Sequence, residues 1–205
     1  MRYAASSWTF LLCVVLLCFV PVVTIAQSGP SHSRTDYNGK WWLSASHDRQ
    51  AGFLEGAADC LTWVAHEDGF NGTADQLQGR ITAYYKKHPA QQAMLVTEVW
   101  QDVWSKLAKN TKPSKQPSDG ETWNNPHWYL DGNWWRQGSE DEEHGFIEGF
   151  LWCMRLRVKK GAEGYPLSDG HYFNKVDQYI RNHPEADDKP VAVILARFSV
   201  QPTSK

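Results

Sequence analysis

Glutamate and histidine, two side chains that can do chemistry, recur at matching positions in two parts of this chain of 205 residues. Glu55 and Glu148 lie 93 positions apart, and His88 and His183 lie 95 apart, each histidine directly before a proline. Glutamate oxygens and histidine nitrogens are both ligands of zinc, and a zinc ion with an open coordination position activates water. A metal-assisted hydrolase therefore requires these four side chains to converge.

The same four residues also have a structural interpretation, which the sequence favours. A histidine before a proline can close the end of a helix, and a glutamate between apolar positions can lie on the flank of a helix. Asp59, the natural further ligand one helical turn from Glu55, is replaced by Trp152 in the second copy. Sequence signatures of serine hydrolases, zinc proteases and phosphate-binding loops are missing. We therefore predict no cofactor and no metal, and favour a protein that is not an enzyme.

Two tryptophan pairs are also repeated, Trp41-Trp42 and Trp134-Trp135, each behind an Asn-Gly or Asp-Gly turn. Exposed tryptophans can stack on sugar rings, so one interpretation is a site for cell-wall carbohydrate. The alternative is that each pair folds over the start of the following helix as a hydrophobic staple. The second alternative is favoured because large aromatic side chains mostly pack in cores.

These repeated residues belong to a longer internal repeat. Gly52-Phe53-Leu54-Glu55-Gly56 returns as Gly145-Phe146-Ile147-Glu148-Gly149, again 93 positions later. The match predicts a tandem duplication, in which each unit buries its apolar face against the other. We expect repeat units at 37–109 and 128–200, joined by a proline-containing linker at 110–127.

Apolar residues recur with helical spacing in both units, which predicts an all-α fold. Each unit is expected to contain three helices, packed as a bundle with pseudo-two-fold symmetry. The first helix begins at Ser46 or Ser139 and stops at Gly69 or Gly161. The second begins at Thr73 or Ser168 and ends at His88 or His183, where the following proline forces the chain out of helical geometry. The third covers the apolar residues that follow.

The paired glycines of the first helix each cost about 1 kcal/mol relative to alanine, so something must approach the backbone closely there. Two partners remain open: another helix packed against the glycines, which is favoured, or a ligand.

The N-terminal residues predict an exported protein. Residues 1–26 have one arginine, an apolar run and small residues at the end, which is typical of a signal peptide. A membrane association is expected only if this segment is not cleaved. Outside it the chain keeps Cys60 and Cys153, one in each unit, for which a disulfide and two buried free thiols remain equal alternatives.

The charge balance excludes one class of partner. With 21 basic and 23 acidic residues the chain has no electrostatic footprint for nucleic acid.

Each half resembles the Tai family of periplasmic amidase immunity proteins. The residues that carry the resemblance are Phe53 to Gly56 and Phe146 to Gly149, followed by an aromatic helix that ends in His-Pro and by a short apolar helix. The family's cysteine usually precedes this aromatic residue, whereas Cys60 and Cys153 follow it by seven positions. The resemblance implies a small helical protein of the periplasm that binds another protein.

Together these observations predict a secreted or periplasmic helical module without enzymatic activity. Its expected partner is another exported or cell-envelope protein, and an immunity-type inhibitor of a cell-wall enzyme is one form of that function. The alternatives are carbohydrate binding through Trp41, Trp42, Trp134 and Trp135, and the metal-assisted hydrolase.

Overall fold

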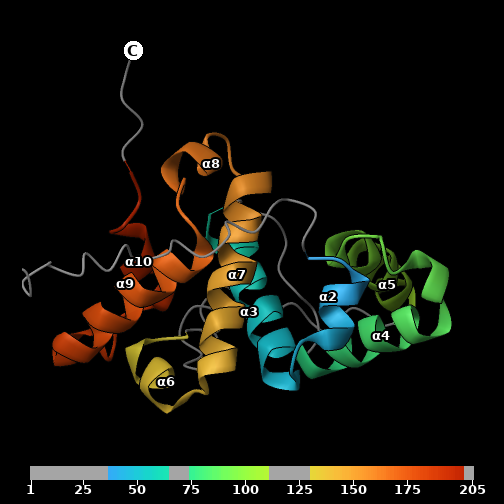
Figure 1. Ribbon diagram of the computed structural model, residues 1–205, viewed down its shortest axis with the longest axis horizontal. Helices are drawn as coiled ribbons and strands as arrows, with labels where there is room; N and C mark the ends of the chain where they lie inside the picture. The colour runs from blue at the N-terminus through green and yellow to red at the C-terminus, as the bar shows by residue number, and fades with distance from the viewer. Residues whose placement is uncertain (1–36, 65–73, 111–129, 201–205) are drawn as a thin grey trace, which may run out of the picture.

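The chain is built from helices around one crossing pair. The structure, a computed structural model, describes residues 37–64, 74–110 and 130–200, and these residues form helices and no strand, which confirms the all-α prediction. The long helices α3 (His47–Trp63) and α7 (Glu140–Arg157) cross at the centre of the molecule. Figure 1 shows α4 and α5 on one side of this crossing and α6, α9 and α10 on the other.

The two halves contain the same order of elements. The first runs through α2 (Gly39–Ser44), α3, α4 (Ala74–Lys87), the 3-10 turn η1 (Pro89–Gln91) and α5 (Val96–Asn110). The second runs through α6 (Gly132–Gln137), α7, α9 (Asp169–Asn182), η3 (Pro184–Ala186) and α10 (Val191–Ala196), with the short α8 (Gly161–Gly164) inserted after α7. An isolated antiparallel bridge closes each half, between Asn38 and Leu95 and between Asp131 and Pro190.

Side chains cap the helices where the sequence predicts them. Ser46 accepts a hydrogen bond from the Arg49 amide at 3.1 Å, and Ser139 accepts one from the Glu142 amide at 3.2 Å. Ser168 caps α9 in the same way. Each cap satisfies an amide that has no partner within its own helix. The helices α4 and α9 end at Lys87 and Asn182, one residue before the predicted ends at His88 and His183.

The end of α7 differs from the prediction. This helix stops at Arg157, and Gly161 begins α8 instead of ending α7. The left-handed conformation belongs to Lys160, with φ of 63°. Gly161 is needed for a different reason, because a Cβ there would lie 1.9 Å from the carbonyl oxygen of Met154.

Two further differences concern short helices. The tryptophan pairs lie inside α2 and α6, which are six residues each and were not predicted. The third helices are unequal, since α5 has 15 residues and α10 has six. Asn110, placed in the linker by the sequence, is the last residue of α5. The predicted signal peptide, the stop at Gly69, the cap at Thr73 and the rest of the linker lie outside the described residues.

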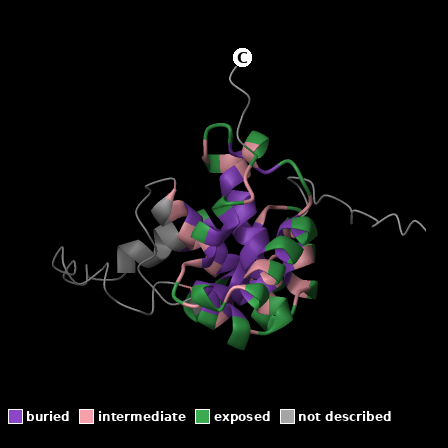
Figure 2. Ribbon diagram, turned by 90° about the vertical axis from the view of Figure 1, so that its left-hand side faces the viewer, coloured by how far each residue is buried: buried purple, intermediate pink, exposed green. Residues whose placement is uncertain are grey.

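The core is continuous across both halves. Phe53, Ala57 and Cys60 of α3 are fully buried, and so are Phe146 and Cys153 of α7. Figure 2 shows buried residues concentrated where these helices cross, with exposed residues on the outer helices. The apolar stripe expected on the first helix of each unit is therefore the shared interior of the protein.

Candidate functional site

The repeated glycines lie at the contact between α3 and α7. A Cβ at Gly149 would lie 1.9 Å from the carbonyl oxygen of Phe53, and one at Gly52 would lie 2.0 Å from that of Glu142. Real side chains never come so close to a backbone, so both positions accept only glycine in this arrangement. Of the two partners left open by the sequence, the glycines contact a helix of the other half.

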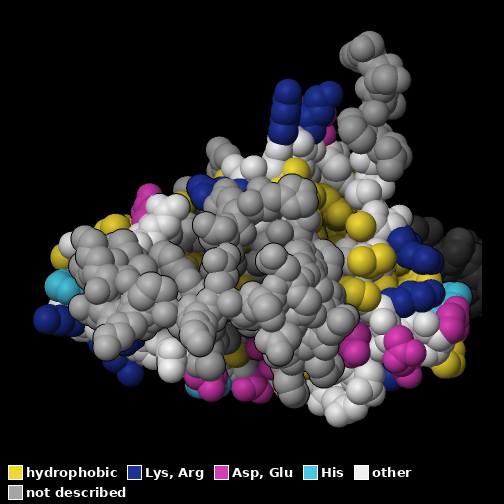
Figure 3. Space-filling model, turned by 180° about the vertical axis from the view of Figure 1, so that it is seen from behind, with side chains coloured by type: hydrophobic (Ala, Val, Ile, Leu, Met, Phe, Trp, Pro, Cys, Tyr) yellow, Lys and Arg dark blue, Asp and Glu magenta, His cyan; other side chains and the backbone are white. Residues whose placement is uncertain are grey.

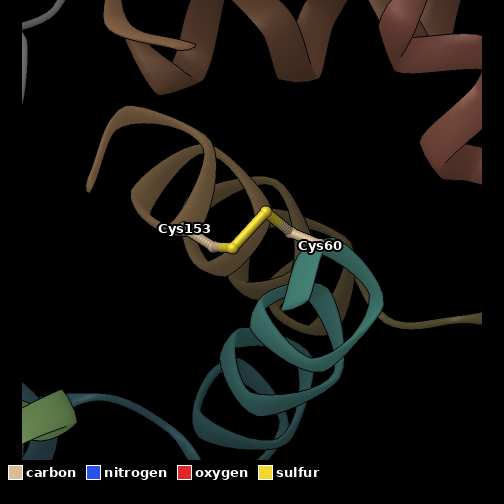
Figure 4. The surroundings of a disulfide bond; sticks show 2 residues. All are labelled: Cys60 and Cys153. Atoms are coloured by element: carbon tan, nitrogen blue, oxygen red, sulfur yellow. A yellow bond between two sulfur atoms is a disulfide. The ribbon is translucent and has the colours of Figure 1, made fainter. Parts of the chain in front are cut away.

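The cysteines join the same two helices. Cys60 and Cys153 form a disulfide, with their Cα atoms 6.0 Å apart, and both residues are fully buried. Figure 4 shows the bond between the end of α3 and the neighbouring turn of α7. The structure thus contains the disulfide and not the pair of free thiols, and a covalent bond fixes the two halves to each other.

Glu148 forms an ion pair with the other half. Its side chain is 2% exposed, and its two oxygens accept hydrogen bonds from Nη2 of Arg49 at 2.5 Å and from Nε at 3.1 Å. A bidentate pair of this kind satisfies a buried carboxylate and orients both groups. The hydrogen bond to Glu148 raises the pKa of Arg49, so the guanidinium stays charged. This glutamate has a structural role between α3 and α7.

Glu55 has a different environment, although it occupies the equivalent position. Its Oε2 atom is buried and has no hydrogen-bond partner among the described residues. Burial raises the pKa of Glu55 to about 7, and the nearby carboxylates Glu142, Asp59 and Asp75 add to the effect. Burial alone raises the pKa of Asp59 to about 7. These groups form a carboxylate-rich region at the crossing of α3 and α7.

The two histidines do not meet. His88 packs on the ring of Tyr84 at 4.8 Å between centroids, and His183 stacks on Tyr179 at 4.3 Å. They follow α4 and α9, whose C-terminal ends lie on opposite sides of the molecule in Figure 1. His183 also lies 2.8 Å from an oxygen of Glu185. Among the described residues no group of three or more histidine, cysteine or acidic side chains could hold a metal ion.

The tryptophan pairs fold onto the core. Trp42 and Trp135 are 0% and 1% exposed, and their indole nitrogens donate hydrogen bonds to Thr82 at 2.9 Å and to Asp177 at 3.4 Å. Trp41 is partly buried against Phe53, and Trp134 is partly buried against Phe146. Each pair covers the side of the following helix, as a staple does, and the inner tryptophan of each pair is not accessible to a sugar ring.

One polar network between the halves was missed by the sequence reasoning. The buried hydroxyl of Tyr37 donates a hydrogen bond to Asp169, which also accepts one from Nη1 of Arg155 at 2.6 Å. Burial, followed by the charge of Glu148, raises the pKa of Tyr37. Leu130 takes the place of Tyr37 in the second half, so this network is not repeated and a search for repeated polar residues does not find it.

Comparison with known proteins identifies no relative. No family model, curated protein or solved structure matches the chain.

None of the helices among the described residues has the length and apolar character needed to cross a bilayer.

Proposed function

We propose that this chain is an exported, non-enzymatic interaction module whose partner is another exported or cell-envelope protein. The disulfide between Cys60 and Cys153 is consistent with an oxidising compartment, because such bonds persist outside the cytosol. The repeated glycines and tryptophans, together with Glu148, serve packing: the glycines and Glu148 contact the other half, and the tryptophans cover the core. Most of the repeated residues are therefore occupied in building a scaffold.

The observation that carries the proposal is a set of exposed apolar side chains on the second half. Leu167, Val193 and Val200 are 45%, 52% and 50% exposed, unlike the other large hydrophobic residues described. The Val200 amide donates a hydrogen bond to the carbonyl of Gly164 at 2.8 Å, which holds the segment after α10 beside α8. Figure 3 shows hydrophobic side chains gathered on the side of α9 and α10. Contiguous exposed apolar surface is typical of protein-binding sites, whereas apolar residues scattered singly are normal, so it is their gathering on one side that supports the proposal.

We further infer that the fold arose by tandem duplication of a helical unit. The repeated sequence, the common order of elements and the matching bridge in each half support this origin. The more specific function, inhibition of a cell-wall enzyme, rests on the resemblance of each half to the Tai family. A covalent tandem then takes the place of a dimer, since one chain supplies both copies of the unit.

A capture experiment tests the proposal. The chain is immobilised and exposed to envelope extract of its source cell, beside a variant with Leu167→Ser, Val193→Ser and Val200→Ser. A control variant with Gln178→Ser changes an exposed polar residue of α9. A protein retained by the wild type and the control, and lost with the triple variant, supports the proposal. Retention on peptidoglycan beads with no protein partner favours carbohydrate binding and refutes it.

A further inference from the structure

The last helices of the two halves, α5 and α10, pack the same face into the core. At the spacing of 95 that relates the two His-Pro pairs, Val191 and Ile194 of α10 correspond to Val96 and Val99 of α5. All four side chains are 0% exposed. The two helices therefore have equivalent inward faces, and their outward faces can be compared position by position.

The outward face of α10 is apolar around one arginine. Val193 and Ala196 of α10 and its C-terminal cap Arg197 follow at spacings of three and four, so they share one face of the helix, and all three are exposed. The corresponding residues of α5 are all polar: Glu98, Gln101 and Asp102. An exposed valine contributes little to the core, so the packing that the two helices share does not explain this apolar face.

Tyr179 of α9 holds Arg197 in place. Nη1 of Arg197 donates a hydrogen bond to the Tyr179 hydroxyl at 2.6 Å, and the guanidinium carbon lies 5.2 Å from the centre of the tyrosine ring. In the first half the equivalent tyrosine, Tyr84, instead donates a hydrogen bond to Gln91. The guanidinium is thus oriented before any partner binds, which lowers the entropic cost of an interaction with it.

Arg197 has no acidic partner of its own. It forms no ion pair with any residue in the described ranges. Four other arginines each pair with a carboxylate: Arg49, Arg136, Arg155 and Arg181. A guanidinium has five N–H donors, of which the tyrosine hydroxyl takes one. The group that best complements the remaining donors is a carboxylate.

We propose that Arg197 binds a carboxylate of the partner protein, while Val193 and the exposed apolar residues near it contact apolar side chains beside that carboxylate. This inference rests on the proposed function and specifies the chemistry of the partner: an acidic segment with apolar neighbours. Figure 3 shows basic and hydrophobic side chains next to each other on the side of α9 and α10. A second copy of the chain is a poorer fit, because two α10 faces bring like charges together and the α5 face is polar.

Peptide selection tests this chemistry. A display library of random twelve-residue peptides is selected on the immobilised wild-type protein, and the affinities of the enriched peptides are measured by fluorescence anisotropy. We expect enriched peptides to carry Asp or Glu between apolar residues. Arg197→Gln should weaken their binding about 10- to 100-fold, and Tyr179→Phe about 3- to 10-fold, because each removes a hydrogen bond that involves a charged group.

A matched control separates this role from a general effect of charge. Arg181→Gln removes an arginine that is also exposed but already pairs with Asp177, so peptide binding should not change. Raising the salt concentration should weaken peptide binding to the wild type and have little effect on binding to Arg197→Gln. Circular dichroism of each variant shows that it is folded.

The outcomes distinguish this inference from the proposed function. Peptides without a carboxylate that bind Arg197→Gln as tightly as the wild type, but not Val193→Ser, overturn the inference and leave an apolar protein-binding surface. If no peptide is retained, the inference is also overturned, while the capture experiment decides the proposed function separately. Binding through Arg197 to phosphatidylglycerol vesicles alone, or to a second copy of the chain, refutes it as well.

Discussion

Removal of the disulfide is expected to lower the free energy of unfolding by about 4 to 5 kcal/mol. The bond joins cysteines separated by 93 residues, and it restricts the unfolded chain by closing this long loop. The chain-entropy relation for a loop of this length gives about 4.7 kcal/mol at 25 °C. The magnitude comes from the unfolded state, because the helices already contact each other closely through the repeated glycines.

Two variants are needed to separate the effect of the disulfide on the free energy of unfolding from the effect of sulfur packing. Cys60→Ala removes the bond and one buried sulfur, whereas Cys60→Ala with Cys153→Ala removes the bond and both sulfurs. Alanine is preferred to serine because both positions are fully buried and a hydroxyl there would lack a partner. The difference between the two variants measures the packing of one sulfur, expected at about 1 kcal/mol. Subtracting it from the loss in the single variant leaves the effect of the bond.

Urea unfolding followed by far-ultraviolet circular dichroism and tryptophan fluorescence gives these free energies. Coincident transitions from both probes establish that unfolding is two-state. The dependence on urea should become steeper without the bond, because the unfolded chain then exposes more surface. If the loss in Cys60→Ala is no larger than the packing difference, or the steepness is unchanged, loop closure does not account for the stability and the reasoning fails.

Three further substitutions test the contacts of the fold by the same unfolding measurement. Gly149→Ala should destabilise the protein by about 1 to 3 kcal/mol or more, because the added Cβ meets the backbone of the other half. Gly79→Ala, where a Cβ meets nothing within 4 Å, should stabilise it by about 1 kcal/mol. Equal effects of the two substitutions on stability would contradict the close contact at Gly149. Arg49→Met should cost about 3 kcal/mol, because it removes the guanidinium that pairs with the buried carboxylate of Glu148, and Arg49→Met combined with Glu148→Leu should recover most of that loss. Thr82→Val should cost about 1 kcal/mol by removing the acceptor of a buried indole, with a shift in tryptophan fluorescence; an unchanged stability and spectrum would refute that hydrogen bond.

Local patterns predicted the helices well. Ser46 and Ser139 cap α3 and α7 where the sequence placed them, and the His-Pro pairs follow the ends of α4 and α9. Capping and the restriction before proline depend on neighbouring residues only, so they can be recognised from a short stretch of sequence. The end of α7 was missed because Gly161 does not stop this helix but packs against Met154, a contact that no local pattern encodes.

The candidate site was predicted less completely. The repeated sequence drew attention to Glu55 and Glu148, but repetition of a residue type says nothing about its charged neighbours. Arg49 and Glu142 occupy equivalent positions with opposite charge: Glu148 pairs with Arg49, whereas burial and nearby carboxylates raise the pKa of Glu55. The Tyr37 network could not be found by repetition, because it occurs in one half only.

The sequence by itself determined that this chain is helical, where α3, α7 and α9 begin, and which faces are apolar, since these properties follow from spacing along the chain. The tertiary structure alone decided which residues of the two halves meet. It paired Cys60 with Cys153, buried the inner tryptophan of each pair and set Arg49 beside Glu148. Contacts between residues about 90 positions apart depend on how two helices cross, and that geometry is fixed by close packing of backbones at the glycines.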